Sequence, residues 1–167
     1  DPHYYIEIAK RNGVASAMSP AARALNSKMP SHSAKEVIRL CGGFAPERAL
    51  VLGFSYKPNV SDSRETPALT LINEMLTLGT SDILVWDPLI ENPRLPEKVI
   101  SISDPYGHED VDCVIIATAH DEVKGLNWKK LRETVLKPRI FDGRRCLPPS
   151  VFLDNGWSYH AIGRPWK

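Results

Sequence analysis

The sequence has few cysteines, no long apolar run and no excess of either charge. Its three cysteines, Cys41, Cys113 and Cys146, are odd in number and widely spaced, which fits neither a disulfide framework nor paired zinc ligands. No uninterrupted apolar stretch reaches the roughly 20 residues that a membrane helix needs, and no charged and then apolar leader precedes the fold. We therefore expect a soluble, cytoplasmic protein without a membrane span or a bound metal.

The charge balance argues against two classes of partner. With 21 basic and 20 acidic residues the net charge is +1, and no run of five like charges occurs. A protein that binds nucleic acid or an acidic membrane would be expected to carry a basic patch or stripe. The 167 residues and 43% hydrophobic content suit one main core with an appended helical segment. A small anionic ligand is compatible with this composition.

The cysteines are expected to be structural. Cys113 lies within the apolar run 111–117, where a small buried hydrophobe is the simplest interpretation. Cys146 lies beside Arg144 and Arg145, and nearby cations lower the pKa of a thiol, which is the argument for a reactive group. We favour a structural role for both.

Periodicity and punctuation predict an α/β fold. Residues 3–12 and 20–40 show helical spacing, with stops at Gly13 and at residues 42–43, and Pro30 predicts a kink or a break in the second helix. Strands are expected at 49–54, 83–86, 111–118, 139–141 and 159–162, with helices at 67–78, 128–136 and 149–155 and a polar loop after Trp86. Apolar strands that alternate with helices predict a Rossmann-like, doubly wound parallel sheet over residues 44–167, preceded by a helical segment, residues 1–43.

Polar loops follow the predicted strands at Leu52, Trp86, Thr118 and Phe141. In doubly wound sheets, ligands bind outside the carboxyl ends of the strands. Residues 53–59, Gly-Phe-Ser-Tyr-Lys-Pro-Asn, form a polar loop that suits an anionic group such as a diphosphate. The glycine-rich fingerprint of a dinucleotide site is missing, because no glycine follows Gly53 before residue 79.

Lys57 and Arg144 are the leading candidates for ligand contacts. A lysine can reach phosphate oxygens or a sugar hydroxyl as a flexible point charge, and an arginine can bind a diphosphate through two parallel hydrogen bonds. Tyr56 could offer a ring face or a hydroxyl to a nucleotide, and a place in the core is an equal alternative. Asp142 could orient Arg144, or begin a turn with Gly143.

The remaining polar residues of these loops are assigned structural roles. Arg64 with Glu65 is expected to pair and fix the loop, with Pro67 in the first turn of the following helix. Asp87 could be compared with the ribose-binding acid of a dinucleotide fold, but we interpret it as opening a loop. The pair His120 and Asp121 could transfer protons, and we interpret it instead as a cap before the helix at 128.

Several segments together resemble the UDP-glucose/GDP-mannose dehydrogenase family. The family's carboxyl-terminal domain has similar Gly-aromatic-x-aromatic-Lys-x-(Asn/Asp) and Asp-x-Arg-Glu-x-Pro-Ala segments, here at 53–59 and 62–68. Val-Trp-Asp-Pro at 85–88, Ile-Ile-Ala-Thr-Ala-His-Asp-Glu at 115–122 and Phe-Asp-Gly-Arg at 141–144 follow in the family's order and at similar spacing. The resemblance extends from residue 1 to about residue 164.

The resemblance implies roles for individual residues. Lys57 and Arg144 match family residues that contact the nucleotide sugar. The opening Asp-Pro-His-Tyr-Tyr resembles the segment after the catalytic cysteine, which places that cysteine four residues before Asp1 and assigns Asp1 to the active site. NAD would bind a domain upstream of this chain, and residues 3–40 would pack between the two subunits of a homodimer. The reaction implied is oxidation of a UDP-sugar C6 alcohol to the acid by two hydride transfers, for polysaccharide precursors.

One branch of the family is favoured. Residues 23–30, Arg-Ala-Leu-Asn-Ser-Lys-Met-Pro, resemble the Ile-Asn-Asp-Ser-Met-Pro segment of the branch that acts on UDP-N-acetylmannosamine or UDP-N-acetylgalactosamine, with Ser27 in place of the usual aspartate. The Asp-Pro at 1–2 is also typical of that branch. A non-enzymatic binding or dimerisation module of the same fold stays open as an alternative. A receiver-type phosphoacceptor domain is disfavoured, because it needs paired acids after its first strand and a lysine after its last, and Asp87 and Lys57 do not follow those strands.

Overall fold

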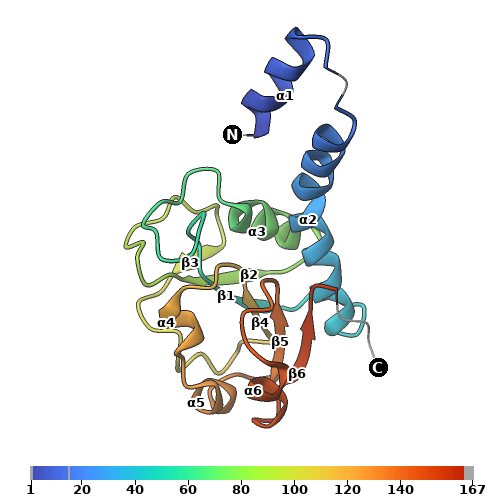
Figure 1. The fold of residues 1–167 in the computed structure, drawn as a ribbon. Helices are drawn as coiled ribbons and strands as arrows, with labels where there is room; N and C mark the ends of the chain where they lie inside the picture. The colour runs from blue at the N-terminus through green and yellow to red at the C-terminus, as the bar shows by residue number, and fades with distance from the viewer. Residues whose placement is uncertain (1, 15, 164–167) are drawn as a thin grey trace.

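A six-stranded parallel sheet forms the centre of the computed structural model, which describes residues 2–14 and 16–163 (Figure 1). The strand order is β3-β2-β1-β4-β5-β6, and every neighbouring pair is parallel. The order reverses between β1 and β4, so the predicted doubly wound α/β sheet is confirmed. The strands are β1 (Arg48–Leu52), β2 (Asp82–Trp86), β3 (Val99–Ser101), β4 (Cys113–Ile116), β5 (Arg139–Asp142) and β6 (Ser158–Ala161).

Helices cover both faces of the sheet (Figure 1). One face packs on α2 (Met18–Leu40) and α3 (Pro67–Thr77), and the other on α4 (Asp121–Lys124), α5 (Trp128–Glu133) and α6 (Pro149–Leu153). Successive side chains of a strand point to opposite faces, so Val51 joins the first core and Leu52 the second. This two-sided burial explains why the central strands β1, β2 and β4 are mostly apolar without alternation.

The helical segment begins with α1 (Pro2–Arg11) and continues into α2. The predicted break at Pro30 is wrong, because α2 runs through it as one helix of 23 residues. The predicted stop is confirmed: Gly42 and Gly43 have positive φ, and their N–H groups bond to the carbonyls of Arg39 and Ile38. α1 lies beyond the sheet beside the amino-terminal half of α2 (Figure 1). Among the described residues, no helix is both long and apolar enough to cross a membrane.

Two elements were not predicted. β3 falls in the segment interpreted as a polar loop, and its three residues include the exposed Ile100 and Ser101, so no apolar run marks it. The four-residue α4 begins at Asp121, where only a cap was expected. β1 ends at Leu52 instead of residue 54, because Gly53 has a φ of 85° and turns the chain out of the sheet.

Candidate functional site

The loops after β1 and β5 both press against the end of β4. A Cβ on Gly53 would lie 2.4 Å from the Thr118 carbonyl oxygen, and one on Gly143 would lie 2.9 Å from the Ile116 carbonyl oxygen. Real Cβ atoms are not found this close to backbone, so both positions depend on the missing side chain. The two loops predicted to bind the ligand therefore leave the sheet on either side of one strand.

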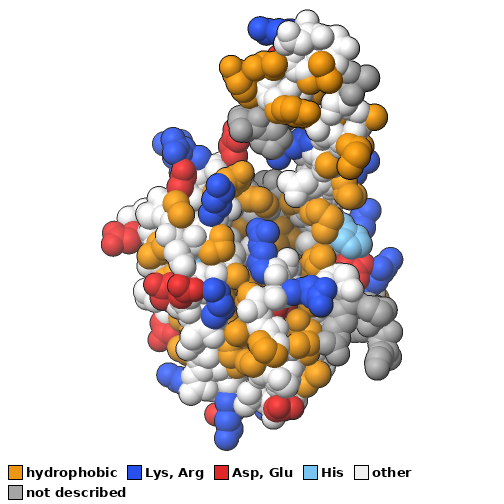
Figure 2. All heavy atoms as spheres, in the orientation of Figure 1, with side chains coloured by type: hydrophobic (Ala, Val, Ile, Leu, Met, Phe, Trp, Pro, Cys, Tyr) orange, Lys and Arg blue, Asp and Glu red, His pale blue; other side chains and the backbone are white. Residues whose placement is uncertain are grey.

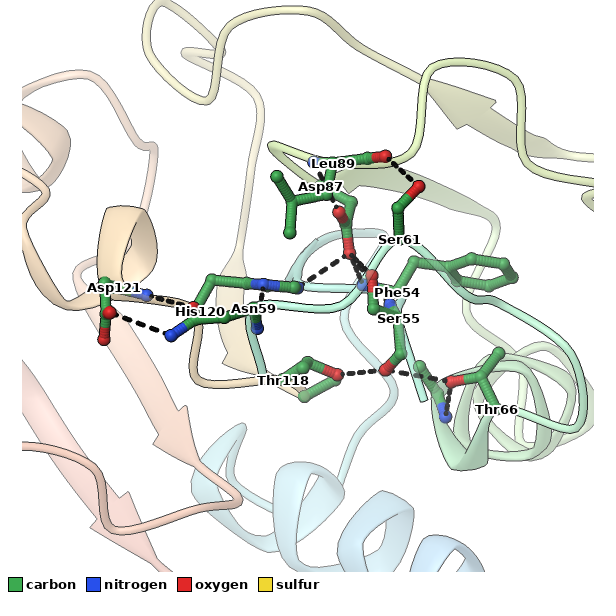
Figure 3. Close-up of polar contacts among 12 residues, drawn as sticks. Phe54, Ser55, Asn59, Ser61, Thr66, Asp87, Leu89, Thr118, His120 and Asp121 are labelled. Carbon is green, nitrogen blue, oxygen red and sulfur yellow. Dashed lines mark hydrogen bonds and ion pairs between the residues drawn. The ribbon is translucent and has the colours of Figure 1, made fainter. Parts of the chain in front are cut away.

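Asp87, at the end of β2, organises the start of the first loop (Figure 3). One carboxylate oxygen accepts hydrogen bonds from the N–H groups of Phe54 at 2.6 Å and Ser55 at 2.8 Å and from the Ser55 hydroxyl at 3.0 Å, and the other accepts from Leu89 N–H at 2.8 Å. Burial raises the pKa of Asp87, but the hydrogen bonds from backbone N–H groups outweigh it, so the pKa lies below its ordinary value. The bond from Leu89 confirms that Asp87 opens a loop.

His120 is the residue that precedes the first turn of α4, but its side chain does not cap a helix, and the predicted cap before the helix at 128 is wrong. Its side chain makes no hydrogen bond to the first turn of α4, and the cap of α5 is Asn127, whose side chain accepts from Lys130 N–H. The imidazole is fully buried, with Nε2 3.1 Å from Asp87 Oδ2 and Nδ1 3.0 Å from the backbone N of Asn59 (Figure 3). No periodic pattern in the sequence could predict these contacts, because the three residues follow three different strands, β1, β2 and β4.

The predicted pair of Arg64 with Glu65 is also wrong. Arg64 bonds to Asp62 instead, with Nη2 2.7 Å from Oδ2, and Glu65 adopts a φ of 51°. The start of α3 is set by Thr66, whose hydroxyl accepts from the N–H of residue 68, followed by Pro67 at the first turn as expected.

Lys57 and Tyr56 lie on the exposed part of the loop after β1, residues 53–60, the Lys57 loop. The Lys57 Nζ is 5.6 Å from the centre of the Tyr56 ring, within the range of a cation–π contact. Tyr56 is 46% exposed, so the alternative that it belongs to the core is wrong. The carbonyl of the preceding Ser55 accepts from the Thr118 hydroxyl at 2.7 Å. The side chains of Lys57 and Tyr56 are therefore accessible on an anchored backbone.

Asp142 shapes the loop after β5. Its two oxygens accept from the N–H groups of Arg144 at 2.9 Å and Cys146 at 3.0 Å, so it both begins the turn and places the arginine. Burial raises the pKa of Asp142, with the N–H donors opposing it. Burial and the Asp142 charge raise the pKa of Cys146 to about 12, which supports a structural thiol.

Arg144 reaches back toward β4. Its Nε donates a hydrogen bond to the Ala117 carbonyl, and burial lowers the pKa of its guanidinium, opposed by Asp142. Ala117 precedes Thr118, which bonds to the loop of Lys57. The two cation-bearing loops therefore leave the same edge of the sheet from strands two spacings apart, about 10 Å.

A cavity of about 170 Å³ adjoins Arg144 between α2, α3 and the ends of β4 and β5. Three of its lining residues, Asn26, Met29 and Pro30, come from the α2 segment whose motif was singled out in the sequence. Sequence spacing alone gave no reason to join that segment to the strand-end loops, because the contact depends on how α2 crosses the sheet. Asp1 lies outside the described residues.

A doubly wound α/β domain with cationic loops at one edge of its sheet defines the class of this protein. The chain belongs to the UDP-glucose/GDP-mannose dehydrogenase family: the model of the family's UDP binding domain matches residues 50–149, more than half of the sequence.

Relatives within the family carry two kinds of substrate name. The UDP-glucose 6-dehydrogenase TuaD of Bacillus subtilis (strain 168) is 31% identical over 164 residues, covering 96% of this chain and 35% of that protein. The UDP-N-acetyl-D-mannosamine dehydrogenase of Pyrococcus horikoshii is 28% identical over 171 residues, covering 98% and 37%. The structure of the NDP-N-acetyl-D-galactosaminuronic acid dehydrogenase of Methanosarcina mazei Go1 matches with a TM-score of 0.79 at 23% identity, covering 97% and 36%, and supports the fold. The chain thus spans about a third of the length of these relatives.

Proposed function

We propose that this chain binds a UDP-sugar at the carboxyl edge of its sheet, with Lys57 and Arg144 holding the diphosphate. The observation that carries the proposal is the bridge at the end of β4, where Thr118 bonds to the Lys57 loop and Ala117 to Arg144. A span of about 10 Å between the strands lets a lysine and an arginine reach one diphosphate from two sides. The match to a UDP binding domain supports the ligand class.

Tyr56 is proposed to contact the nucleotide. Its ring is 46% exposed and lies beside the Lys57 ammonium, so a base or ribose that approaches the lysine also meets the ring. The ammonium would leave the ring when phosphate oxygens replace this weaker contact.

The intact protein is proposed to be an NAD-dependent UDP-sugar 6-dehydrogenase that supplies polysaccharide precursors. By resemblance, Asp1 belongs to its active site and the catalytic cysteine lies upstream. NAD is proposed to bind outside the described residues, because the loop after β1 does not fit a dinucleotide: Gly53 already touches Thr118, and the Asp87 carboxylate, where a ribose would bind, is occupied by backbone N–H groups. The chain by itself is proposed to bind ligand without turnover.

The favoured substrate is a UDP-N-acetylhexosamine. The support is the residue 23–30 motif, because its Asn26, Met29 and Pro30 line the cavity beside Arg144. A cavity of about 170 Å³ with both polar and apolar walls is compatible with a small ligand group of mixed polarity.

A homodimer through the helical segment is also proposed. Apolar side chains on α1 and the amino-terminal half of α2 are exposed, as the orange patch over these helices in Figure 2 shows. The most exposed are Tyr4 at 70%, Met18 at 84% and Leu25 at 65%. An apolar surface of this kind is typical of a subunit interface.

Titration of the chain with UDP, followed by NMR chemical shifts, tests the ligand site. Lys57→Ala and Arg144→Gln should each weaken UDP binding by about tenfold or more, because each removes a charge-assisted hydrogen bond. Lys129→Ala on α5 and Arg145→Gln are the charge-matched controls and should change the affinity less than threefold. Equal effects of the test and control variants would contradict the site.

The activity is tested on a longer protein that includes the upstream sequence. NADH formation should be faster with UDP-N-acetylmannosamine or UDP-N-acetylgalactosamine than with UDP-glucose. A preference for UDP-glucose would overturn the choice of branch, and no turnover of any UDP-sugar would overturn the proposed enzyme.

A further inference from the structure

His120 connects two residues, Asp87 and Asn59, that are far apart in sequence and lie at the carboxyl ends of neighbouring strands. Its imidazole is fully buried and lies between Asp87, at the end of β2, and Asn59, in the Lys57 loop (residues 53–60; Figure 3). The side chain of Asp87 is 1% exposed, so this contact is shielded from water. A buried hydrogen bond of this kind is costly to break, because the freed groups find no water to replace the partner.

The partners of His120 determine where its ring proton lies. The backbone N–H of Asn59 can only donate, so Nδ1, at 3.0 Å, must accept and carries no proton. Nε2 then holds the proton and donates to Asp87 Oδ2 at 3.1 Å. The neutral imidazole offers one donor and one acceptor on separate ring atoms, which is what a bridge between a carboxylate and an N–H group needs.

Asn59 is anchored a second time by its own side chain. Its Nδ2 donates to Asp121 Oδ2 at 2.8 Å, and its Oδ1 accepts from the Asp121 N–H at 3.0 Å. The residue has a φ of 60°, in the left-handed region that asparagine tolerates better than most side chains. The segment after β4 therefore holds Asn59, near the end of the Lys57 loop, through both His120 and Asp121.

Lys57 lies midway between the two fixed points. On one side Ser55 donates its N–H to Asp87 and accepts from Thr118, and on the other side Asn59 bonds to His120. Three residues separate the anchors, and one of them, Pro58, restricts the backbone further. Without the bond to His120, Asn59 would be held only through its side chain, by Asp121, and ligand binding would have to fix the backbone of residues 56–59, which lowers affinity.

We propose that His120, as the Nε2–H tautomer, is a positioning residue that sets the backbone of the Lys57 loop for ligand binding. His120 does not touch the ligand and acts through Lys57. The inference rests on the proposed role of Lys57 in binding UDP, and it adds a residue whose sequence context indicated only a helix cap.

Two near-isosteric variants separate the bonds of His120. In His120→Asn the carboxamide lies near the position of Nδ1 and can still accept from Asn59, whereas in His120→Gln it lies near Nε2 and retains only the bond to Asp87. We expect His120→Gln to weaken UDP binding by about tenfold and His120→Asn by less than about threefold, since the Asn59 N–H loses its partner only in His120→Gln. Equal losses in the two variants would overturn the proposal.

A double-mutant cycle with Lys57 distinguishes positioning from a general loss of structure. If His120 acts through Lys57, His120→Gln should cause no further loss of UDP affinity once Lys57→Ala is present. If the losses of UDP affinity in the two single variants multiply in the double variant, the two residues act independently, and the proposal is overturned. Hydrogen exchange of the Asn59 N–H, measured by NMR, should be faster in His120→Gln than in His120→Asn.

Leu131→Ala is the control for stability alone. Leu131 is a fully buried residue of α5 on the second face of the sheet, away from the Lys57 loop, so its truncation should lower stability and leave UDP affinity unchanged. A wild-type chain with no measurable affinity for UDP would overturn the proposed function and this inference with it. A wild-type chain that binds through Lys57 but is insensitive to His120→Gln would overturn this inference alone.

Discussion

At the scale of single residues, two buried aspartates organise the ligand edge in different ways. Asp87 collects enough hydrogen bonds to hold its pKa below the ordinary value in spite of burial, whereas the pKa of Asp142 is raised because burial dominates. Each sets the backbone of a loop that carries a candidate cation, Lys57 in one case and Arg144 in the other. Both aspartates thus fix the backbone of the candidate ligand-binding loops and are not proposed to contact the ligand.

The opposite pKa shifts predict opposite dependences of stability on pH. The folded pKa of Asp87 is lowered, so its contribution is fully present above its unfolded pKa of about 4 and is lost as the pH falls through the folded value. Asp87→Asn should therefore lower the free energy of unfolding at pH 7 by about 1–3 kcal/mol and flatten its decline below pH 4. Urea unfolding between pH 2.5 and 7 measures both effects.

Asp142→Asn is the matched comparison. The folded pKa of Asp142 is raised, so its ionised form is disfavoured in the fold and stability gains as the pH falls through the folded value from above. Replacing this carboxylate should remove a destabilising charge at pH 7, and its cost there should be smaller than that of Asp87→Asn. An identical pH dependence for the two variants would contradict the assigned shifts.

At the scale of elements, the end of β4 is the contact point for the loops from both sides. Thr118 touches the loop after β1, and Ala117 accepts from Arg144 after β5. Gly53 and Gly143 allow these approaches, because a Cβ on Gly53 would collide with the backbone of Thr118, just after β4, and one on Gly143 with the last residue of β4. The packing of three strand ends, more than any one loop sequence, therefore sets the spacing of the candidate cations.

Gly53→Ala should lower the stability of the protein more than Gly42→Ala does. Gly53 and Gly42 have φ values of 85° and 83°, so alanine pays about 1–2 kcal/mol of left-handed strain at either position. Only at Gly53 does the added Cβ also meet backbone, at Thr118. Thermal unfolding of the two variants should show a clearly larger loss for Gly53→Ala, and equal losses would argue against the close packing.

At the scale of the whole molecule, the carboxyl-terminal half of α2 packs against the sheet and its amino-terminal half projects beyond it (Figure 1). Its carboxyl-terminal half buries Ala34, Val37 and Leu40. The Glu36 Oε2 atom there lies 2.9 Å from Nε2 of His160 in β6. The amino-terminal half carries the exposed Leu25 and packs beside α1. One long helix thus connects the sheet to the surface proposed for dimerisation.

The proposed homodimer predicts a specific sensitivity to charge. Leu25→Glu should shift the chain from dimer to monomer in sedimentation velocity, because it places a charge in the apolar interface. Phe44→Glu is the control, since Phe44 is 78% exposed but follows the end of α2. A wild-type chain that sediments as a monomer at every concentration would contradict the dimer.

Sequence patterns predicted most of the fold and named part of the candidate site. The strands predicted at 49–54, 83–86, 111–118, 139–141 and 159–162 are all found in the structure with shifted ends. They were recognisable because burial on both faces favours successive apolar residues, most clearly in β1 and β4. β3 was missed because a short edge strand with Ile100 exposed has no such run. Pro30 was expected to kink or break α2, and the helix continues through it without a break, while the residues of its second half are buried against the sheet.

The sequence by itself determined the alternation of strands and helices, the end of α2 at its two glycines, and the loops that carry Lys57 and Arg144. These features follow from local backbone freedom and from the period of burial, which neighbouring residues encode. Only the tertiary structure decided that His120 meets Asp87 and Asn59, which are 33 and 61 residues away. The strand order brings the ends of β2, β1 and β4 side by side, and no local pattern records which polar groups then face one another.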